Sequence, residues 1–385
     1  MNLRTLAWLS SLASLQVGCG LLGGVEVRSV GTSVQKPSNV ALYVAVENDS
    51  EPVDDLEAKS FRIYEDDVPV DTEAGKHVLG NRDDVAVHHT VVLLDLSGGP
   101  DEATRARIAR GASHLAEKLQ RDQGVTLLGF DGSPRLHPLG ELPRNATSFP
   151  PKLDSITSFR SSDESRNLNG ALVQALDQLD ARLMRHKKPL RVGTLVVFSR
   201  GDDLAGRVPA DVLWERLKET PHEIYGIGLD GAESQALDSI AKNGVKKSAS
   251  ITDLPVAFED MALTVRRAAG KYYLVQYCSP GRSGIRRLRL EVQREDKDGK
   301  VDKGALELEL DAREFSGGCD PKTRPTFAQG LSEPGARKSE PEASTEPKAK
   351  AAPGKARSGA LRDVPSTQPT TEEEIVAPPS SSDYE

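Results

Sequence analysis

The chain has 385 residues, a net charge of −8 with histidine uncharged, and only 3 cysteines. Binding to DNA or RNA needs a basic face that meets phosphates, so the acidic balance argues against nucleic acid as a partner. The small number of cysteines, two of them close together late in the chain, agrees with an exported protein.

The amino terminus has the features of an export signal. A basic residue, Arg4, precedes an apolar stretch from Leu6 to Val17, which is shorter than the about 20 residues that a membrane-spanning helix needs. The following Leu-Gln-Val-Gly-Cys resembles a bacterial lipoprotein processing box, although Gln16 stands where leucine is preferred. We expect residues 1–19 to be a signal peptide with a lipobox and Cys19 to carry the lipid. The alternative is ordinary secretion with Cys19 free or paired.

Residues 25–75 alternate apolar and polar side chains, which favours short antiparallel strands. The predicted strands are VEVRSV, NVALYVAVEN and SFRIYEDDVPV, with turn signals at Asn48-Asp49-Ser50 and Glu65-Asp66-Asp67. The segment VENDSEPVDDLEAKSFRIYEDDVPV also resembles the β-module that directly precedes the A domain in bacterial proteins with a von Willebrand factor A-related domain. The sequence therefore predicts an amino-terminal β-module.

Residues 88–270 alternate between apolar runs and amphipathic stretches, the pattern of a parallel sheet with helices on both faces. The predicted strands are TVVLLDL, GVTLLGF, RVGTLVVFS and HEIYGIGL, with a weaker one from Lys247 to Ile251. The predicted helices are 101–121, 168–184, 209–219, 232–243 and 254–269. Residues 75–89 are expected to link the modules, with His88 and His89 just before the first central strand. Neighbouring side chains of a strand point to opposite faces, so this pair is not expected to share a metal ion.

The first central strand ends in Asp95 and opens onto a small polar loop, TVVLLDLSGG. A buried strand that carries a carboxylate and the hydroxyl of Ser97 to its end resembles the first loop of a metal-ion-dependent adhesion site. In the von Willebrand factor A family this loop reads Asp-x-Ser-x-Ser, and here Gly99 replaces the second serine. The segments SRNLNGALVQALDQL and RVGTLVVFSRGDD resemble the other two loops, but Arg166 replaces a threonine and Arg200 an aspartate.

The resemblance implies a site at the carboxyl ends of the strands, where ligands bind in such sheets. Three interpretations stay open. In the first, Arg166, Arg200 or both neutralise Asp95, so that an internal ion pair replaces the cation, because guanidinium groups repel cations and bind carboxylates. In the second, both arginines point into solvent and the site is inactive. In the third, Mg²⁺ keeps a site because substitute ligands come from Asp202, Asp203 or Asp101.

Residues 271–315 contain three more predicted strands, KYYLVQYCS, IRRLRLEVQR and GALELELDA. The second would place Arg287 and Arg289 on its wet side and apolar side chains on the other. KYYLVQYCSPGRSGIRRLRLEV resembles the strand pair that follows the A domain in the same bacterial family. Because neither set of strands can shield two faces alone, we expect this set and residues 25–75 to form one sandwich. The predicted fold class is α/β, with a doubly wound, mostly parallel sheet inserted in or flanked by a small antiparallel β-sandwich.

Cys278 and Cys319 are the natural disulfide pair, and their bond would stabilise the fold by roughly 4 kcal/mol in the chain-entropy model. Two buried thiols that lie near one another are the alternative. Residues 320–385 hold few aromatic residues and many of the prolines, serines, lysines and glutamates. Such a segment buries too little apolar surface to offset its conformational entropy, so a disordered tail is predicted.

No catalytic set can be assembled from the sequence, so we do not expect an enzyme. It contains no nucleophile elbow and no phosphate loop, and no base or oxyanion hole can be located for Ser97. We expect no cofactor beyond the Mg²⁺ that Asp95 and Ser97 would hold in the metal-binding alternative. A small-molecule substrate is not expected either.

We expect a membrane-anchored module of the cell envelope that binds a protein or cell-surface ligand. The predicted binding face holds Gly99, Arg166, Arg200 and Asp202, and an arginine not used by Asp95 would take an acidic group of the partner. The alternatives are a structural or envelope-assembly lipoprotein and a metal-dependent adhesin with substitute ligands. Gly20 stands where some bacterial lipoproteins of the inner membrane carry aspartate, which favours the outer membrane.

Overall fold

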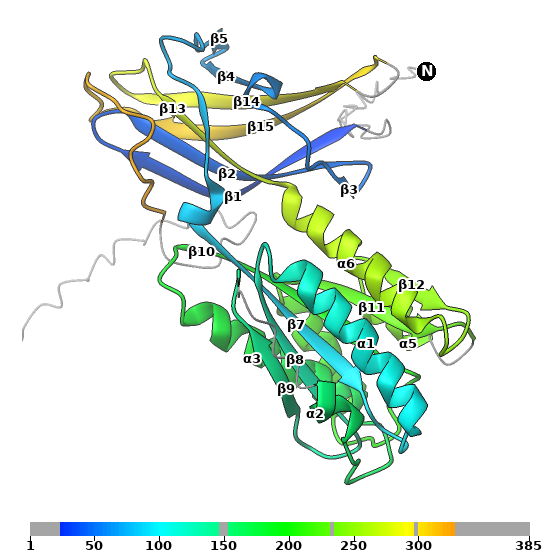
Figure 1. The fold of residues 1–385 in the computed structure, drawn as a ribbon. Coiled ribbons are helices and arrows are strands. Elements are labelled where there is room, and N and C mark those ends of the chain that lie inside the picture. Colours follow the sequence, from blue (N-terminus) through cyan, green and yellow to red (C-terminus); the bar gives the residue numbers. More distant parts are fainter. Residues whose placement is uncertain (1–23, 146–152, 232–234, 296–298, 328–385) are drawn as a thin grey trace, which may run out of the picture. The chain divides into compact units, whose positions relative to one another are not determined.

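The computed structural model describes residues 24–145, 153–231, 235–295 and 299–327, and Figure 1 shows how they fold. The lipidation predicted at Cys19 and most of the predicted tail lie outside these residues. In this part of the chain, none of the helices is long and apolar enough to cross a membrane. The described residues form an α/β domain and an antiparallel β-sandwich.

The α/β domain is built on a six-stranded sheet. Its strands, in spatial order, are β12 (Val245–Ser248), β11 (Glu223–Leu229), β10 (Leu190–Phe198), β7 (Ala86–Asp95), β8 (Gly124–Phe130) and β9 (His137–Leu142). All neighbouring strands are parallel except β8 and β9. The predicted doubly wound, mostly parallel sheet is thereby confirmed.

Helices cover both faces of this sheet, which is why its central strands are apolar on both sides. One face is covered by α1 (Glu102–Leu119), α2 (Leu153–Thr157) and α6 (Leu254–Gly270). The other is covered by α3 (Leu168–Met184), α4 (Ala210–Glu219) and α5 (Gln235–Ile240). In the first core, the rings of Phe198 and Phe258 lie 5.6 Å apart. In the second, Leu172 and Leu176 of α3 are fully buried.

Two local predictions for this domain were wrong. Strand β9 was missed, because its sequence HPLGEL contains Pro138 and alternates weakly. His88 and His89 lie inside β7 rather than before it. They have separate partners, with His88 Nε2 3.1 Å from Tyr43 Oη and His89 Nε2 2.9 Å from Thr126 Oγ1. Burial lowers their pKa values to about 3 and about 4, so both rings are neutral at physiological pH.

Strands from both ends of the folded chain build the sandwich (Figure 1). One sheet contains β1 (Val25–Gln35), β2 (Asn39–Asn48), β13 (Tyr272–Cys278) and β6 (Val78–Gly80), with β3 (Glu51–Pro52) paired to β2. The other contains β15 (Val301–Asp311), β14 (Ile285–Glu295), β4 (Phe61–Glu65) and β5 (Val68–Pro69). A shared core that includes Val44, Ile63, Tyr277 and Leu290 joins the two sheets. The α/β domain is therefore inserted into the sandwich, as the predicted fold class stated.

Within the sandwich, the turn signals of the sequence are used as expected. Asp49 and Ser50 have φ angles of 51° and 67°, and Asp66 and Asp67 have φ angles of 51° and 64°. Two left-handed residues in a row make the tight turns that match the twist of paired strands, and short polar side chains tolerate this conformation. Part of the expected linker 75–89 is strand β6, which pairs with β13, and Arg82–Asp84 is a 3₁₀ turn, as is Ala58–Ser60.

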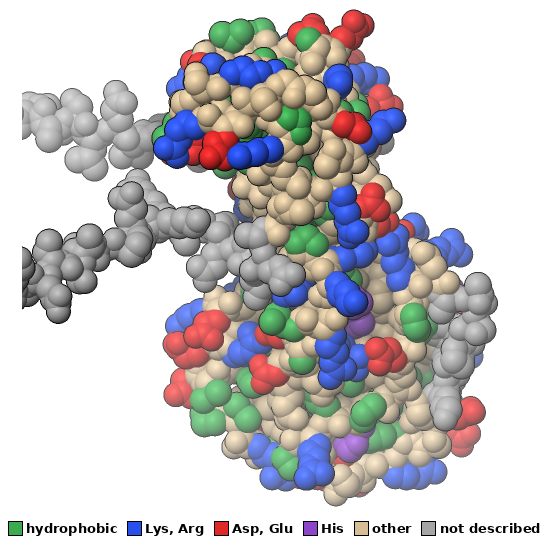
Figure 2. Space-filling model, turned by 90° about the vertical axis from the view of Figure 1, so that its left-hand side faces the viewer, with side chains coloured by type: hydrophobic (Ala, Val, Ile, Leu, Met, Phe, Trp, Pro, Cys, Tyr) green, Lys and Arg blue, Asp and Glu red, His purple; other side chains and the backbone are tan. Residues whose placement is uncertain are grey.

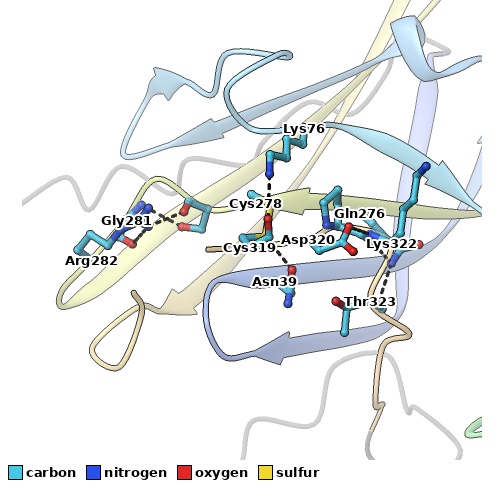
Figure 3. The surroundings of a disulfide bond; sticks show 12 residues. Asn39, Lys76, Gln276, Cys278, Gly281, Arg282, Cys319, Asp320, Lys322 and Thr323 are labelled. Carbon is cyan, nitrogen blue, oxygen red and sulfur yellow. Dashed lines mark hydrogen bonds between the residues drawn. A yellow bond between two sulfur atoms is a disulfide. The ribbon is translucent and has the colours of Figure 1, made fainter. Parts of the chain in front are cut away.

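The predicted disulfide between Cys278 and Cys319 is present, and Figure 3 shows its surroundings. It joins the end of β13 to the segment that follows β15. Residues 320–327, which composition alone places in the tail, pack against the sandwich, because Phe327 is buried to 6% exposure in an apolar cluster with Tyr43 and Leu190.

Candidate functional site at the strand ends

The candidate site lies where β7 and β10 end. These strands are adjacent and parallel, and Leu94 pairs with Phe198, so Asp95 and Arg200 leave the sheet at the same edge. Arg166 reaches this edge from the start of α3. Asn167 caps that helix by accepting a hydrogen bond from the Gly170 amide at 3.3 Å, which fixes the residue before it.

The carboxylate of Asp95 is completely buried and fully hydrogen-bonded. Its Oδ1 accepts from the amide and the hydroxyl of Ser97, at 3.0 and 2.5 Å. Its Oδ2 accepts from Arg166 Nε at 2.8 Å and from the Arg200 amide at 2.9 Å. Arg200 Nη2 lies 3.8 Å from Oδ1. The ion pair that the sequence suggested is therefore formed, with Arg166 as the closer partner.

Both arginine side chains are turned inward. Their exposed fractions are 13% for Arg166 and 19% for Arg200. Arg166 Nη1 donates to the carbonyl of Asp202 at 3.0 Å, and Arg200 Nη2 donates to the carbonyl of Ser97. The interpretation in which both arginines point into solvent is wrong, because Asp95 and backbone carbonyls hold them. For the same reason they are not free to take an acidic group of a partner.

The proposed substitute ligands serve other purposes. Asp101 caps α1 by accepting from the Thr104 amide at 2.7 Å. Asp203 accepts from the amides of Asn169 and Gly206, at 3.0 and 2.8 Å. Asp202 is exposed, and it contributes its carbonyl to Arg166. Among the described residues, no group of three or more His, Cys, Asp or Glu side chains could hold a metal ion.

A divalent cation does not fit the residues around Asp95. Mg²⁺ requires near-octahedral ligation by oxygen atoms. Here the carboxylate that would be the first ligand accepts four hydrogen bonds, one of them from a guanidinium group. A cation at this place would have to displace Arg166 and approach Arg200, both of which carry a positive charge.

A second buried aspartate, missed in the sequence, lies at the end of β8. Asp131 is completely buried. Its Oδ1 accepts from the Ser133 amide at 2.8 Å, and its Oδ2 from the Ser162 amide at 2.9 Å. The hydroxyls of Ser161 and Ser162 lie 3.2 Å from Oδ2, and His137 Nε2 lies 3.3 Å from Oδ1. The signal that could have found it is Asp-Gly-Ser after the apolar run GVTLLGF, which repeats the pattern of Asp95-Leu-Ser97.

The environment of Asp131 favours its ionised form. Burial by itself raises the pKa of this carboxyl, but hydrogen bonds from Ser133, Ser162 and His137 together lower it far below its usual range. The group is therefore a fixed negative charge at every physiological pH. No basic side chain other than His137 forms an ion pair with it among the described residues.

Backbone hydrogen bonds tie the loops of this edge together. The amide of Gly98 donates to the Glu164 carbonyl at 2.9 Å, and the amide of Gly132 donates to the Asp163 carbonyl at 2.9 Å. The amide of Leu204 donates to the Arg166 carbonyl at 2.8 Å. The loop before α3 is thus cross-linked to the loops that follow β7, β8 and β10, which fixes the surface above Asp95.

The outer surface of these loops presents carboxylates and one apolar side chain. Glu164 and Asp202 are exposed, and Leu204 is 68% exposed. Gly99 is also exposed with φ 52°, and a Cβ there would lie 3.5 Å from Glu164 Oε1. On the face of the molecule drawn in Figure 2, basic and acidic side chains are interspersed. At the strand ends, Arg166 and Arg200 point inward, whereas Glu164 and Asp202 lie on the outer surface.

The solved structures similar to this chain include domains of the same fold class. They include a von Willebrand factor type A protein from Catenulispora acidiphila, with 12% identity, a TM-score of 0.40, and coverage of 76% of this chain and 74% of that one. Manganese-loaded TRAP protein from Plasmodium vivax has 13% identity, a TM-score of 0.38, and coverage of 62% and 97%. Mussel byssus proximal thread matrix protein 1 with a zinc-occupied MIDAS motif has 14% identity, a TM-score of 0.36, and coverage of 53% and 49%.

Neither the protein-family models nor the curated proteins compared with the chain gave a match. The doubly wound fold itself follows from the strand order and from the helices that cover both faces of the sheet.

Proposed function

We propose that this chain is a binding module of the bacterial cell envelope. It recognises a protein or a cell-surface ligand through the strand-end face of its von Willebrand factor A-like domain, and it does so without a divalent cation. One observation carries the proposal. The carboxylate that would hold the cation is saturated by Ser97, Arg166 and the Arg200 amide.

The fixed loops around Asp95 support a binding role. A surface already held in one conformation loses little entropy when a partner docks. Leu204, at the outer end of such a loop, can be buried by a partner without being ordered first. We infer that the contact surface consists of Gly98, Gly99, Glu164, Asp202 and Leu204, and call it the strand-end face.

The charges of the strand-end face suggest what it binds. Glu164 and Asp202 offer exposed carboxylates, while Arg166 and Arg200 are held inside. A bound cation would make the strand-end face positive, whereas these carboxylates make it negative. We therefore infer that the partner supplies basic groups, which surround an apolar contact with Leu204. The predicted contribution of Arg166 and Arg200 changes accordingly, since they position the loops and do not touch the partner.

We propose that the chain is tethered to the membrane of the cell envelope. A signal peptide and lipidation of Cys19 would tether the module to the membrane, with the outer membrane favoured by Gly20. A disulfide between Cys278 and Cys319 agrees with an oxidising compartment. We also propose that the chain is not an enzyme. The hydroxyl of Ser97 supports this, because it is completely buried and donates to a carboxylate that Arg166 neutralises.

Calorimetric titration of Mg²⁺ and Mn²⁺ tests the cation-free site. The full chain is expected to show no binding at micromolar to millimolar metal. The variant Gly99→Ser/Arg166→Thr/Arg200→Asp restores the residue types of the family's loops, and it is expected to gain affinity for both ions. Micromolar binding by the unchanged chain would contradict the proposal.

Capture of envelope proteins tests the binding role. Leu204→Asp should abolish capture, whereas Leu263→Asp, a matched change at a 46% exposed leucine of α6, should leave it unchanged. Capture should persist with chelator, because no cation takes part. Loss of capture with chelator would favour a metal-dependent adhesin. Equal capture by both variants, or none by the unchanged chain, would favour the structural or envelope-assembly role.

A further inference from the structure

The segment Cys319–Phe327, here called the strap, lies across the sandwich after β15 and forms no strand. Figure 3 shows its first part beside β2 and β13, with Cys319 bonded to Cys278 and close to Asn39. Lys76 Nζ donates to the Cys319 carbonyl at 3.0 Å. The disulfide thus fixes one end of the strap to the end of β13.

Few other contacts hold the strap. Gln276, a buried residue of β13, donates to the carbonyls of Pro321 and Thr323, at 2.7 and 3.3 Å. The Thr326 amide donates to Ser33 Oγ at 3.1 Å, and Arg324 donates to the Asp84 carbonyl at 2.8 Å. These bonds are scattered along the segment, and no ladder of backbone hydrogen bonds reinforces them.

The far end of the strap is held by apolar burial, since both Pro325 and Phe327 are buried. Phe327 is 6% exposed, in an apolar slot formed with Gly31 and Leu190. A Cβ at position 31 would lie 2.9 Å from Leu190 Cδ2 and 3.2 Å from Phe327 Cδ1, so glycine is what leaves room for the ring. Removing Phe327 from this slot would expose apolar surface on the sandwich.

The balance of these contacts points to the disulfide as the element that keeps the strap in place. Ordering the backbone of an irregular segment costs conformational entropy at every residue. The hydrogen bonds return little of that cost, because each one replaces a hydrogen bond to water. Burial of Pro321, Pro325 and Phe327 returns a further part of it. The cross-link offsets a further part of the cost in the chain-entropy model, because it keeps the strap close to its site in the unfolded chain as well.

We propose that the Cys278–Cys319 disulfide is a redox-sensitive latch, whose reduction releases the strap and uncovers the apolar slot of Phe327. A dithiol reductant supplies the two electrons and two protons. Its thiolate attacks one cysteine sulfur to form a mixed disulfide, and its second thiol resolves that bond. The products are the thiols of Cys278 and Cys319 and the oxidised, disulfide form of the reductant. In an oxidising compartment the strap stays closed.

Limited proteolysis with chymotrypsin tests the latch in the full chain. Cleavage after Phe327 requires its ring to leave the slot, so it reports release directly. Pre-treatment with a dithiol, or the variant Cys278→Ser/Cys319→Ser, should raise the cleavage rate there about tenfold or more. Cleavage after Tyr43 and Phe130, which are 0% and 1% exposed, should stay unchanged, because the cores do not open. The fragments are identified by mass spectrometry.

Two results would overturn the latch. Equal cleavage after Phe327 with and without reduction would mean that the other contacts hold the strap. A parallel rise after Tyr43 and Phe130 would mean that the disulfide supports the whole fold instead of the strap alone. Reduction of the unchanged protein gives the answer even where the serine variant does not fold. Disulfide-intact Gln276→Ala serves as the control, with a smaller expected rise than reduction because it removes only two hydrogen bonds.

Discussion

The ends of β7 and β8 each bury an aspartate carboxylate, and the two carboxylates are stabilised in different ways. Each strand delivers a completely buried aspartate to the same edge of the sheet, Asp95 in one and Asp131 in the other. In each, Oδ1 accepts from the amide of a serine two residues further on. Asp95 is then neutralised by a guanidinium group, whereas Asp131 is surrounded by amides, hydroxyls and an imidazole.

The difference separates two means of keeping a carboxylate ionised inside a protein. An ion pair supplies a full opposite charge but must bury that charge as well, so losing one partner is costly. Hydrogen-bond donors supply only dipoles, yet several of them together hold the charge and no second ion is buried. Asp95 therefore has the charge of Arg166 in addition to hydrogen bonds from Ser97 and the Arg200 amide, whereas Asp131 depends on several hydrogen bonds together.

The largest effect is expected from Arg166→Met, which keeps much of the volume but leaves the charge of Asp95 buried beside Arg200 alone. Unfolding by urea should show a loss of about 3 kcal/mol or more. Arg200→Met should cost less, since its backbone amide still donates to Asp95 and its side chain is 3.8 Å from the carboxylate. Equal losses for the two variants would contradict the assignment of Arg166 as the main counter-ion.

A smaller effect, with a defined pH dependence, is expected from Asp131→Asn. An amide cannot accept all the donors around it, so the loss at pH 7 is about 2 kcal/mol. The folded pKa of Asp131 is lowered, so its stabilisation is present above the unfolded value of about 3.9 and is lost as pH falls towards the folded value. The difference in the free energy of unfolding between the unchanged chain and the variant should be constant from pH 7 to about 5. It should become smaller below about pH 4. A difference that widens in acid would refute this account.

The smallest effects distinguish the two serines. Ser97→Ala removes a hydroxyl that donates to Asp95 at 2.5 Å and should cost about 1 kcal/mol. Ser133→Ala should destabilise the fold less, because Asp131 still accepts from the Ser133 amide at 2.8 Å and from the Ser162 amide at 2.9 Å. Thermal unfolding of both variants measures the difference. A larger loss of stability for Ser133→Ala than for Ser97→Ala would contradict this account. It would show that a single donor near Asp131 contributes as much as the group of donors is expected to contribute.

The sequence was sufficient to predict which edge of the sheet carries the candidate site and to identify one of its two buried aspartates, Asp95. Apolar runs ending in Asp95 and before Arg200 mark adjacent buried strands, and the arginines stand where a family pattern expects ligands. The orientation of those arginines could not be read, because Asp202, which is distant in sequence, supplies the carbonyl that Arg166 Nη1 bonds. Rotamers of long side chains depend on such tertiary contacts.

Asp131 and the order of residues 320–327 were not predicted from the sequence, and both omissions have a physical reason. Asp131 was not sought, because the family pattern names no ligand on that loop, although Asp131-Gly-Ser133 has the same local form. The order of residues 320–327 was hidden by their composition, since a disulfide, two buried prolines and one phenylalanine replace the larger apolar surface that a folded segment normally shows. Composition measures average hydrophobicity and does not register a single cross-link.

The place of β2 between β1 and β13 has a consequence for synthesis. Tyr43 pairs with Leu274, so over residues 39–45 the edge of β2 that faces away from β1 has no partner until the whole α/β domain has been made. During synthesis, the nascent chain therefore contains the apolar strand β2 with one unpaired edge until β13 has been made. Open strand edges are the usual starting point of aggregation.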